Sequence, residues 1–331
     1  MMEELLVTAR DNALIDPGLH IWTWEVAMYL FLGGLTAGVM IFAAAMTILD
    51  KDREAPFAST RLALIAPIVL SLGMTTLFLD LEHKLFVFRF YTSFQPTSPM
   101  SWGAWILLVI YPVSILQILS TLRDGYSPLA WFVDSVKAGR RLLDWCERYR
   151  TEIAVVAIPF AVALGIYTGI LLSAFGARPF WNSGVLGPLF LISGMSTAAA
   201  LVALIARRKG EKQLFTKIDL VLIVAEIALV ALFLINLATG SGQQIEALQS
   251  VTGGSYTFVF WVLFVGFGLL IPLLLELLEI SGVSRSMAML APVLVLIGGY
   301  VLRQVMLDAG QESTWTRYPT QYSAELLQRR P

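Results

Sequence analysis

The chain has 331 residues, 57% of them hydrophobic and only 14% charged, and its mean hydropathy is +0.74. Soluble domains are roughly half apolar and about a quarter charged, so this composition excludes an ordinary soluble protein and indicates an integral membrane protein. The 23 Lys and Arg residues balance the 24 Asp and Glu residues to a formal net charge of −1, which gives no reason to expect a nucleic acid partner. The one cysteine, Cys146, excludes an internal disulfide and any iron–sulfur cluster held by this chain alone.

Membrane spans are predicted where about 20 apolar residues follow one another, the length that crosses roughly 30 Å of hydrocarbon. These runs lack the alternation of barrel strands, and backbone groups in lipid must be bonded within the protein, so the spans are expected to be helices. The fold class is therefore an all-α integral membrane protein. Eight spans are predicted, at residues 21–49, 62–80, 101–120, 152–175, 188–206, 218–239, 256–278 and 287–307.

The spans are expected to form two four-helix bundles, because Tyr29–Gly38 and Pro188–Thr197 read alike and each lies in the first helix of a set of four. The loop between the third and fourth spans combines aromatic and basic residues, which suits a helix lying in the membrane interface. The expected division is 1–120 for spans one to three, 121–150 for this inside loop, 151–175 for span four, 188–307 for the second bundle and 308–331 for an outside tail.

The distribution of basic residues predicts the orientation. The loops after spans one, three, five and seven hold 15 Lys and Arg residues, whereas the opposite face and both tails together hold 8. Because loops that stay inside carry the excess of Lys and Arg, both termini are expected outside. In the cytoplasmic membrane of a bacterium, that side is the periplasm.

The first span carries a polar and aromatic stripe. Its members are spaced by three or four residues, which places them on one helical face. Such a face suits a pocket for a flat, amphipathic ligand, and it equally suits a helix-packing face with one buried carboxyl group. The stripe consists of Trp22, Glu25, Tyr29, Gly33 and Thr36.

Asp80 and His83 at the end of the second span form a candidate proton-transfer pair. They stand at i and i+3, so a continued helix would bring them to one face at the outer interface. A carboxyl group beside an imidazole orients the ring and passes protons, whereas charged residues at a helix end also simply solvate the interface. On span four, the Tyr167 hydroxyl either donates to a ligand carbonyl or bonds a neighbouring backbone carbonyl.

Ionisable residues inside spans are costly and need an explanation. Glu226 lies deep in span six, and Asp219 lies nearer its inner end. Together they suggest either part of a proton route or a neutral glutamic acid bonded to an adjacent helix. Glu276, near the inner end of span seven, is interpreted as an interfacial residue.

The order of motifs resembles that of the NrfD/PsrC family, the quinone-handling membrane subunits of polysulfide reductase and related respiratory complexes. The resemblance covers nearly all eight spans, and the segment from Pro96 to Gly103 is its most specific part. The motifs are Trp24-Glu25, Tyr29-Leu-Phe-Leu-Gly-Gly-Leu-Thr-Ala-Gly38, Asp80-Leu, Pro96-Thr-Ser-Pro-Met-Ser-Trp-Gly103, Tyr167-Thr-Gly-Ile-Leu-Leu and Pro179-Phe-Trp-Asn-Ser.

This resemblance implies a haem-free and metal-free subunit that binds menaquinone or ubiquinone in the first bundle near the outer face. It implies that a ferredoxin-like iron–sulfur subunit with four clusters docks on that face and leads to a molybdopterin catalytic subunit. His83 and Tyr167 would bond the quinone oxygens, Asp80 would relay protons and orient His83, and the opposite wall would consist of Glu25 and Tyr29, with Trp22 beside them. Glu25 departs from the polar groups that other members use in this region.

Two other classes compete with this one. A secondary transporter, or a proton-translocating subunit without quinone chemistry, also has buried acids, but transporters usually carry matched broken helices in both halves, and the prolines here do not pair in that way. A haem anchor would need His20 and His83, the two histidines of the chain, to face each other. His20 falls at the very start of span one, which disfavours that arrangement.

Overall fold

The structure is a computed structural model that describes residues 22–282 and 289–313. All the regular secondary structure in this part of the chain is helical, and eight helices are long and apolar enough to cross a membrane, as predicted. His20 and the tail beyond Ser313 lie outside the described residues. The eight are Trp24–Ile48 (α2), Leu62–Asp80 (η1 and α4), Pro99–Leu119 (α6), Arg150–Ser173 (α10), Leu186–Ile205 (α11), Lys209–Ala238 (α12), Val259–Ile280 (η3 and α14) and Leu290–Glu312 (α15).

Two helices extend well beyond their predicted bounds. α12 begins at Lys209 rather than at 218, and α15 ends at Glu312 rather than at 307. An apolar window measures the hydrocarbon crossing, whereas a helix continues for as long as its backbone bonds are made and its polar side chains find water or partners. The charged first turns of α12 and the polar last turn of α15 therefore belong to the helices.

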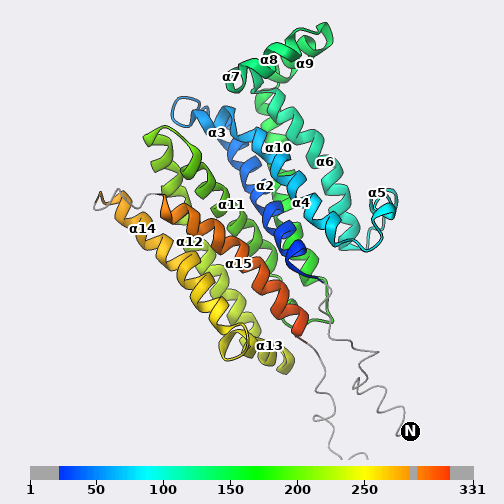
Figure 1. The fold of residues 1–331 in the computed structure, drawn as a ribbon, viewed down its shortest axis with the longest axis vertical. Coiled ribbons are helices and arrows are strands. Elements are labelled where there is room, and N and C mark those ends of the chain that lie inside the picture. The colour runs from blue at the N-terminus through cyan, green and yellow to red at the C-terminus, as the bar shows by residue number, and fades with distance from the viewer. Residues whose placement is uncertain (1–21, 283–288, 314–331) are drawn as a thin grey trace, which may run out of the picture.

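The eight long helices are divided here by chain order into two sets (Figure 1). The first helix set, as we name it, comprises α2, α4, α6 and α10, and the second comprises α11, α12, η3–α14 and α15. α2 joins them, because it packs on α10 and α4 within its own set and on α11 and α15 of the other. It is also largely buried, as a central helix must be.

Small residues allow α2 and α11 to approach closely. A Cβ atom added at Gly38 would overlap the carbonyl of Gly194 and the side chain of Ala198, so the two backbones are in contact there. Close contact of this kind is a main source of helix association in lipid, where hydrophobic burial supplies no net drive. The two helix sets are therefore held at a fixed separation.

The two ends of the bundle differ. One end carries four short helices, and we name it the basic end (Figure 1). These helices are α3 (Pro56–Thr60), α7 (Leu122–Gly125), α8 (Ser127–Asp134) and α9 (Lys137–Arg148). Arg123 ties three of them by bonds to Asp134 at 2.6 Å, Asp144 at 2.8 Å and Glu147 at 2.7 Å. These bonds raise the pKa of Arg123 and lower that of Asp134.

The opposite end is named the pocket end. It holds the start of α2 and the ends of α4, α10 and α15, together with the short helices η2 (Lys84–Phe86), α5 (Arg89–Thr92) and α13 (Gly242–Thr252). Gln311 of α15 bonds to the backbone of Trp22 beside the start of α2, which places both ends of the described chain here.

Candidate functional site

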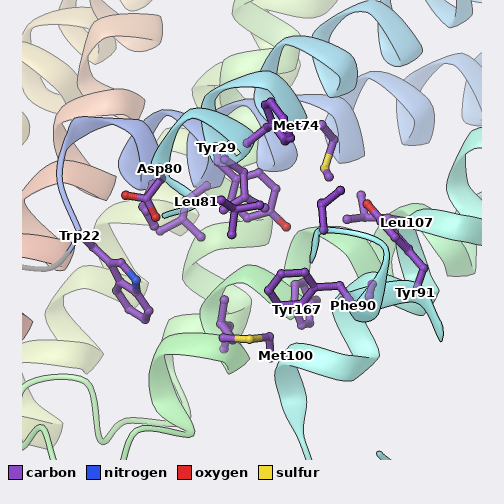
Figure 2. A pocket seen from close by; sticks show the side chains of 18 of the residues that line it. Trp22, Tyr29, Met74, Asp80, Leu81, Phe90, Tyr91, Met100, Leu107 and Tyr167 are labelled. Atoms are coloured by element: carbon purple, nitrogen blue, oxygen red, sulfur yellow. The ribbon is translucent and has the colours of Figure 1, made fainter. Parts of the chain in front are cut away.

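A cavity of about 340 Å³ lies at the pocket end of the first helix set (Figure 2). Its volume falls in the range of roughly 300–1,000 Å³ that is typical of small-molecule sites. Helices α2, α4, α6 and α10 supply its walls, and the segment after α4 closes it with Val87, Phe90 and Tyr91. The apolar lining includes Met74, Phe78, Met100, Leu107 and Leu172.

Two buried phenols project into the cavity (Figure 2). Tyr29 is 4% exposed and Tyr167 is 5% exposed, and within the part of the chain that the structure describes neither hydroxyl has a hydrogen-bond partner. A phenol hydroxyl can donate and accept a hydrogen bond, so two of them facing one cavity suit a small molecule that carries acceptors. Tyr91 is a third hydroxyl in the lining, and burial raises its pKa, which keeps it a neutral donor.

Tyr167 has room because residue 103 is glycine. A Cβ atom at Gly103 would overlap the ring and the hydroxyl of Tyr167. The segment that contains Gly103 therefore does more than begin α6. It lets α6 pass directly beside the phenol on α10.

The loop before α6 is folded back on the first turn of that helix. The Ser101 hydroxyl donates to the Ser93 carbonyl at 3.2 Å and accepts from the Gln95 N–H at 3.0 Å, and the Trp102 indole N–H donates to the Pro96 carbonyl at 2.6 Å. Ser98 is the N-cap residue of α6, and Pro99 follows it, although the Ser98 side chain makes no capping bond. This folding positions α5 over the cavity.

Asp80 and His83 do not share a helical face. α4 ends at Asp80, and Leu81 is extended, with φ −65° and ψ 123°, so the i and i+3 arrangement expected from a continued helix is wrong. Asp80 lines the cavity, whereas the His83 side chain is exposed and outside the lining. The role of His83 stays a prediction.

Only part of the stripe predicted on the first span lines the cavity. Trp22 and Tyr29 line the cavity, but Glu25 does not. The Glu25 carboxylate accepts a hydrogen bond from the Thr23 hydroxyl, and it lies near enough to Asp80 to repel it. Trp22 precedes the helix, which begins at Trp24, so helical spacing does not relate it to Glu25.

A second polar cluster lies inside the second helix set. Asp219 is fully buried, accepts from the Ser196 hydroxyl at 2.6 Å and lies near the Glu276 carboxyl group. Glu276 is 1% exposed, so its interpretation as an interfacial residue is wrong. The burial of Glu276 could not be predicted from the sequence, because the position of a residue near a helix end does not show which neighbouring helices cover its side chain.

Glu226 and Arg303 continue the cluster toward α2. Arg303 is fully buried. The count of Lys and Arg residues used to predict the orientation had included it among the residues of the outer face. Its guanidinium donates to the Ser193 hydroxyl at 2.5 Å and to the Phe190 carbonyl at 2.9 Å. Glu226 lies near the same serine and near the guanidinium. Among the described residues, no three His, Cys, Asp or Glu side chains gather as metal ligands.

The substitution Gly103→Ala tests whether the cavity is the working site. The added methyl group must push the Tyr167 ring out of place, and overpacking of this kind costs about 1–3 kcal/mol. We expect the KM for the cavity's ligand to rise roughly tenfold, because each 1.4 kcal/mol is a factor of about ten. Steady-state kinetics measure it, and Gly176→Ala is the control because a Cβ there meets nothing within 4 Å. Equal KM values for the two variants would contradict the assignment.

These features define a class: an all-helical, multi-pass membrane protein with a mostly apolar pocket and convergent hydroxyl groups at one end. A profile of the family described as polysulphide reductase, NrfD, matches residues 14–313. The chain therefore belongs to the NrfD/PsrC family of polysulfide reductase membrane subunits.

Three relatives illustrate the range of the family. The protein NrfD homolog of Haemophilus influenzae is 30% identical over 312 residues, which cover 88% of this chain and 94% of that protein. A component chain of the polysulfide reductase of Wolinella succinogenes is 28% identical, with 88% and 94% covered. A subunit of the selenate reductase of Mesobacillus selenatarsenatis is 23% identical, with 93% and 80% covered.

Proposed function

We propose that this chain is the membrane anchor and the quinone-binding electron-transfer subunit of a respiratory oxidoreductase complex. The observation that carries the proposal is the pair of buried tyrosines, Tyr29 and Tyr167, which line one apolar cavity together with Asp80. A quinone has the matching chemistry, because it is a flat, apolar ring with two carbonyl acceptors. Menaquinone and ubiquinone both meet this description.

Each group in the cavity has a defined task in this proposal. A bound quinone supplies a two-electron, two-proton reaction whose end states are both neutral. Tyr29 and Tyr167 hold the ring oxygens by donating hydrogen bonds, and Asp80 gives or takes a proton at the edge of the cavity. Trp22 supplies a flat wall, and the apolar lining excludes water. His83 and Glu25 lie outside the lining and would act on this site through Asp80.

The ligand would enter from the lipid between α4 and α6. Phe78 of α4 and Met100 of α6 both line the cavity and are 41% and 43% exposed on the outer surface of the bundle. Farther from the pocket end, the Ser71 and Tyr111 hydroxyls bond at 3.1 Å and join the two helices. A lipid-soluble ligand could therefore slip between the helices at the cavity without crossing water.

The partners follow from the family. The relatives include proteins whose names make them components of a polysulfide reductase and of a tetrathionate reductase. By analogy, a ferredoxin-like iron–sulfur subunit with four clusters would dock on the pocket end and pass electrons between the cavity and a molybdopterin catalytic subunit. Docking there minimises the tunnelling distance. The two helix sets would then serve as the two predicted four-helix bundles, the first for quinone and the second for support or proton transfer.

We place the pocket end outside, on the periplasmic face of a bacterial cytoplasmic membrane, because Lys and Arg residues are concentrated at the opposite end. We expect an impermeant thiol reagent to label Thr92→Cys in intact cells and to leave Lys137→Cys unlabelled until the membrane is opened. Both side chains are exposed, whereas Cys146 is buried and burial raises its pKa, so the native thiol adds little background. The reverse labelling pattern would overturn the orientation and the docking face together.

A second candidate function, proton transfer across the membrane, is favoured by the cluster in the second helix set. The Asp219 and Glu276 carboxyl groups lie near each other and are both buried, and Glu226 with Arg303 continues the polar line toward α2. Asp219 and Glu226 would be its proton carriers. Glu226→Gln distinguishes the two functions. If the cluster is a proton route, the variant should lose acidification of vesicles and keep quinone turnover. If the chain binds quinone without pumping, the substitution should change neither acidification nor turnover.

The proposed function is tested by comparing two electron donors in the purified complex. Reduced quinone must drive turnover, and a quinone-site inhibitor must stop it, while an artificial donor that reduces the iron–sulfur partner directly continues to work. If membranes from which all quinone has been extracted still support turnover, the proposal is overturned. The artificial donor shows that the partner subunits are intact.

A further inference from the structure

Trp22, which lines the cavity, is not held by the helix that follows it. α2 begins at Trp24, so the backbone of Trp22 lies outside the helical hydrogen bonds. Instead, one side chain of the second helix set satisfies both of its groups. The Trp22 N–H donates to Gln311 Oε1 at 2.9 Å, and Gln311 Nε2 donates to the Trp22 carbonyl at 2.8 Å. Gln311 is 4% exposed, so both bonds are shielded from water.

Gln311 is itself fixed by the loop between α10 and α11. Arg178, 6% exposed, donates to the Gln311 carbonyl at 2.9 Å and to the Ser313 carbonyl at 3.0 Å, which are acceptors that the end of α15 leaves open. The Trp181 indole N–H donates to the Met306 carbonyl at 2.7 Å. The last turn of α15 therefore cannot shift without breaking these bonds.

Two aromatic rings fix the indole of Trp22 as well. The Phe175 ring packs edge-on at 5.3 Å, and the Trp181 ring stacks at 5.7 Å with an angle of 27° between the planes. Figure 2 shows the Trp22 side chain at the edge of the cavity near Asp80. The flat wall beside the proton-transfer carboxyl is thus set by side chains from beyond the first helix set.

We infer that Gln311 is a positioning residue for the ligand cavity: it fixes the Trp22 wall and thereby sets the affinity for the ring of the quinone. The inference rests on the proposed function of the cavity. An amide suits the task because it donates and accepts at once. An ionised carboxylate in its place would accept from the Trp22 N–H, but it has no proton to donate to the Trp22 carbonyl and its negative charge would repel that oxygen.

The first test is Gln311→Ala in the assembled complex. Losing two bonds worth about 0.5–1.5 kcal/mol each should raise the KM for reduced quinone roughly tenfold, with kcat within about twofold and turnover with the artificial donor unchanged. Gln304→Ala is the matched control, because the Gln304 amide bonds Tyr300 and Asp308 on its own helix. It should leave the KM unchanged.

Gln311→Glu tests the chemistry without removing the side chain. A protonated carboxyl group donates and accepts as the amide does, so the KM of this variant relative to the native chain should approach one as the pH falls and rise as the pH increases. Gln311→Ala should keep a constant ratio. This readout also serves if Gln311→Ala fails to assemble, because a role in folding alone would not make the KM ratio follow pH.

Gly103→Ala separates failure of the inference from failure of the function. If Gly103→Ala raises the KM and both Gln311 variants keep the native value, the inference is overturned and the cavity assignment stands. If all three keep the native KM, the cavity is not the quinone site and both proposals are overturned. A raised KM in Gln311→Ala, with a pH-dependent ratio in Gln311→Glu, supports the inference.

Discussion

Replacing Asp80 with Asn is expected to lower quinone-coupled turnover roughly 10²- to 10⁴-fold, the usual cost of losing a proton-transfer group. Among the carboxylates of the described chain, Asp80 is the one that lines the cavity. Asparagine keeps the size of the side chain but cannot exchange a proton. Turnover with reduced quinone measures the effect, and turnover with the artificial donor should stay at the native level.

His83→Ala is the matched comparison for Asp80→Asn. The His83 side chain is exposed, and if it only solvates the interface, its replacement should change free energies by no more than about 0.5 kcal/mol. A loss as large as that of Asp80→Asn would establish the role that the sequence predicts for His83. Native turnover in Asp80→Asn would remove the carboxyl group from the mechanism.

Replacing Arg303 with Met is expected to destabilise the protein by about 3–5 kcal/mol, because removing one member of a buried charge pair leaves the other uncompensated. Arg303 is fully buried and Glu226 is 2% exposed. The change also removes the donors that Ser193 and Phe190 now accept from. Thermal unfolding in detergent and the yield of inserted protein measure the loss.

The double variant Arg303→Met with Glu226→Gln provides the control for this prediction, because it removes both charges and should recover most of the stability. Arg207→Met, at an exposed position of the basic end, should remain within about 0.5 kcal/mol of the native protein. Equal losses in the single and double variants would show that the two charges are not coupled.

The fold was largely predictable because the hydrocarbon core imposes one length and one composition on every crossing helix. The site was predictable where chemistry sits on a regular helix: Tyr29, Asp80 and Tyr167 all line the cavity. His83 was misplaced because the helix ends three residues before it. Periodicity cannot show such an end when no glycine or proline marks it.

Other residues of the site depend on tertiary contacts. Gly103 matters because Tyr167 from another helix occupies the space beside it, and Arg303 is buried because three helices surround it. A sequence pattern describes one element at a time, so it reports neither kind of contact. The aromatic segment around Tyr91 offered a usable signal, since Tyr91 lies five residues before Pro96, where the Pro96–Gly103 motif begins.

The most direct test of the account is photolabelling of the assembled complex with a light-activated quinone, followed by mass spectrometry of the labelled peptides. Label is expected on peptides that contain Met74–Tyr91 and Met100–Leu107, and it should be lost when excess natural quinone competes. Label confined to α12 and α15, or label at the cavity that natural quinone fails to displace, would contradict it.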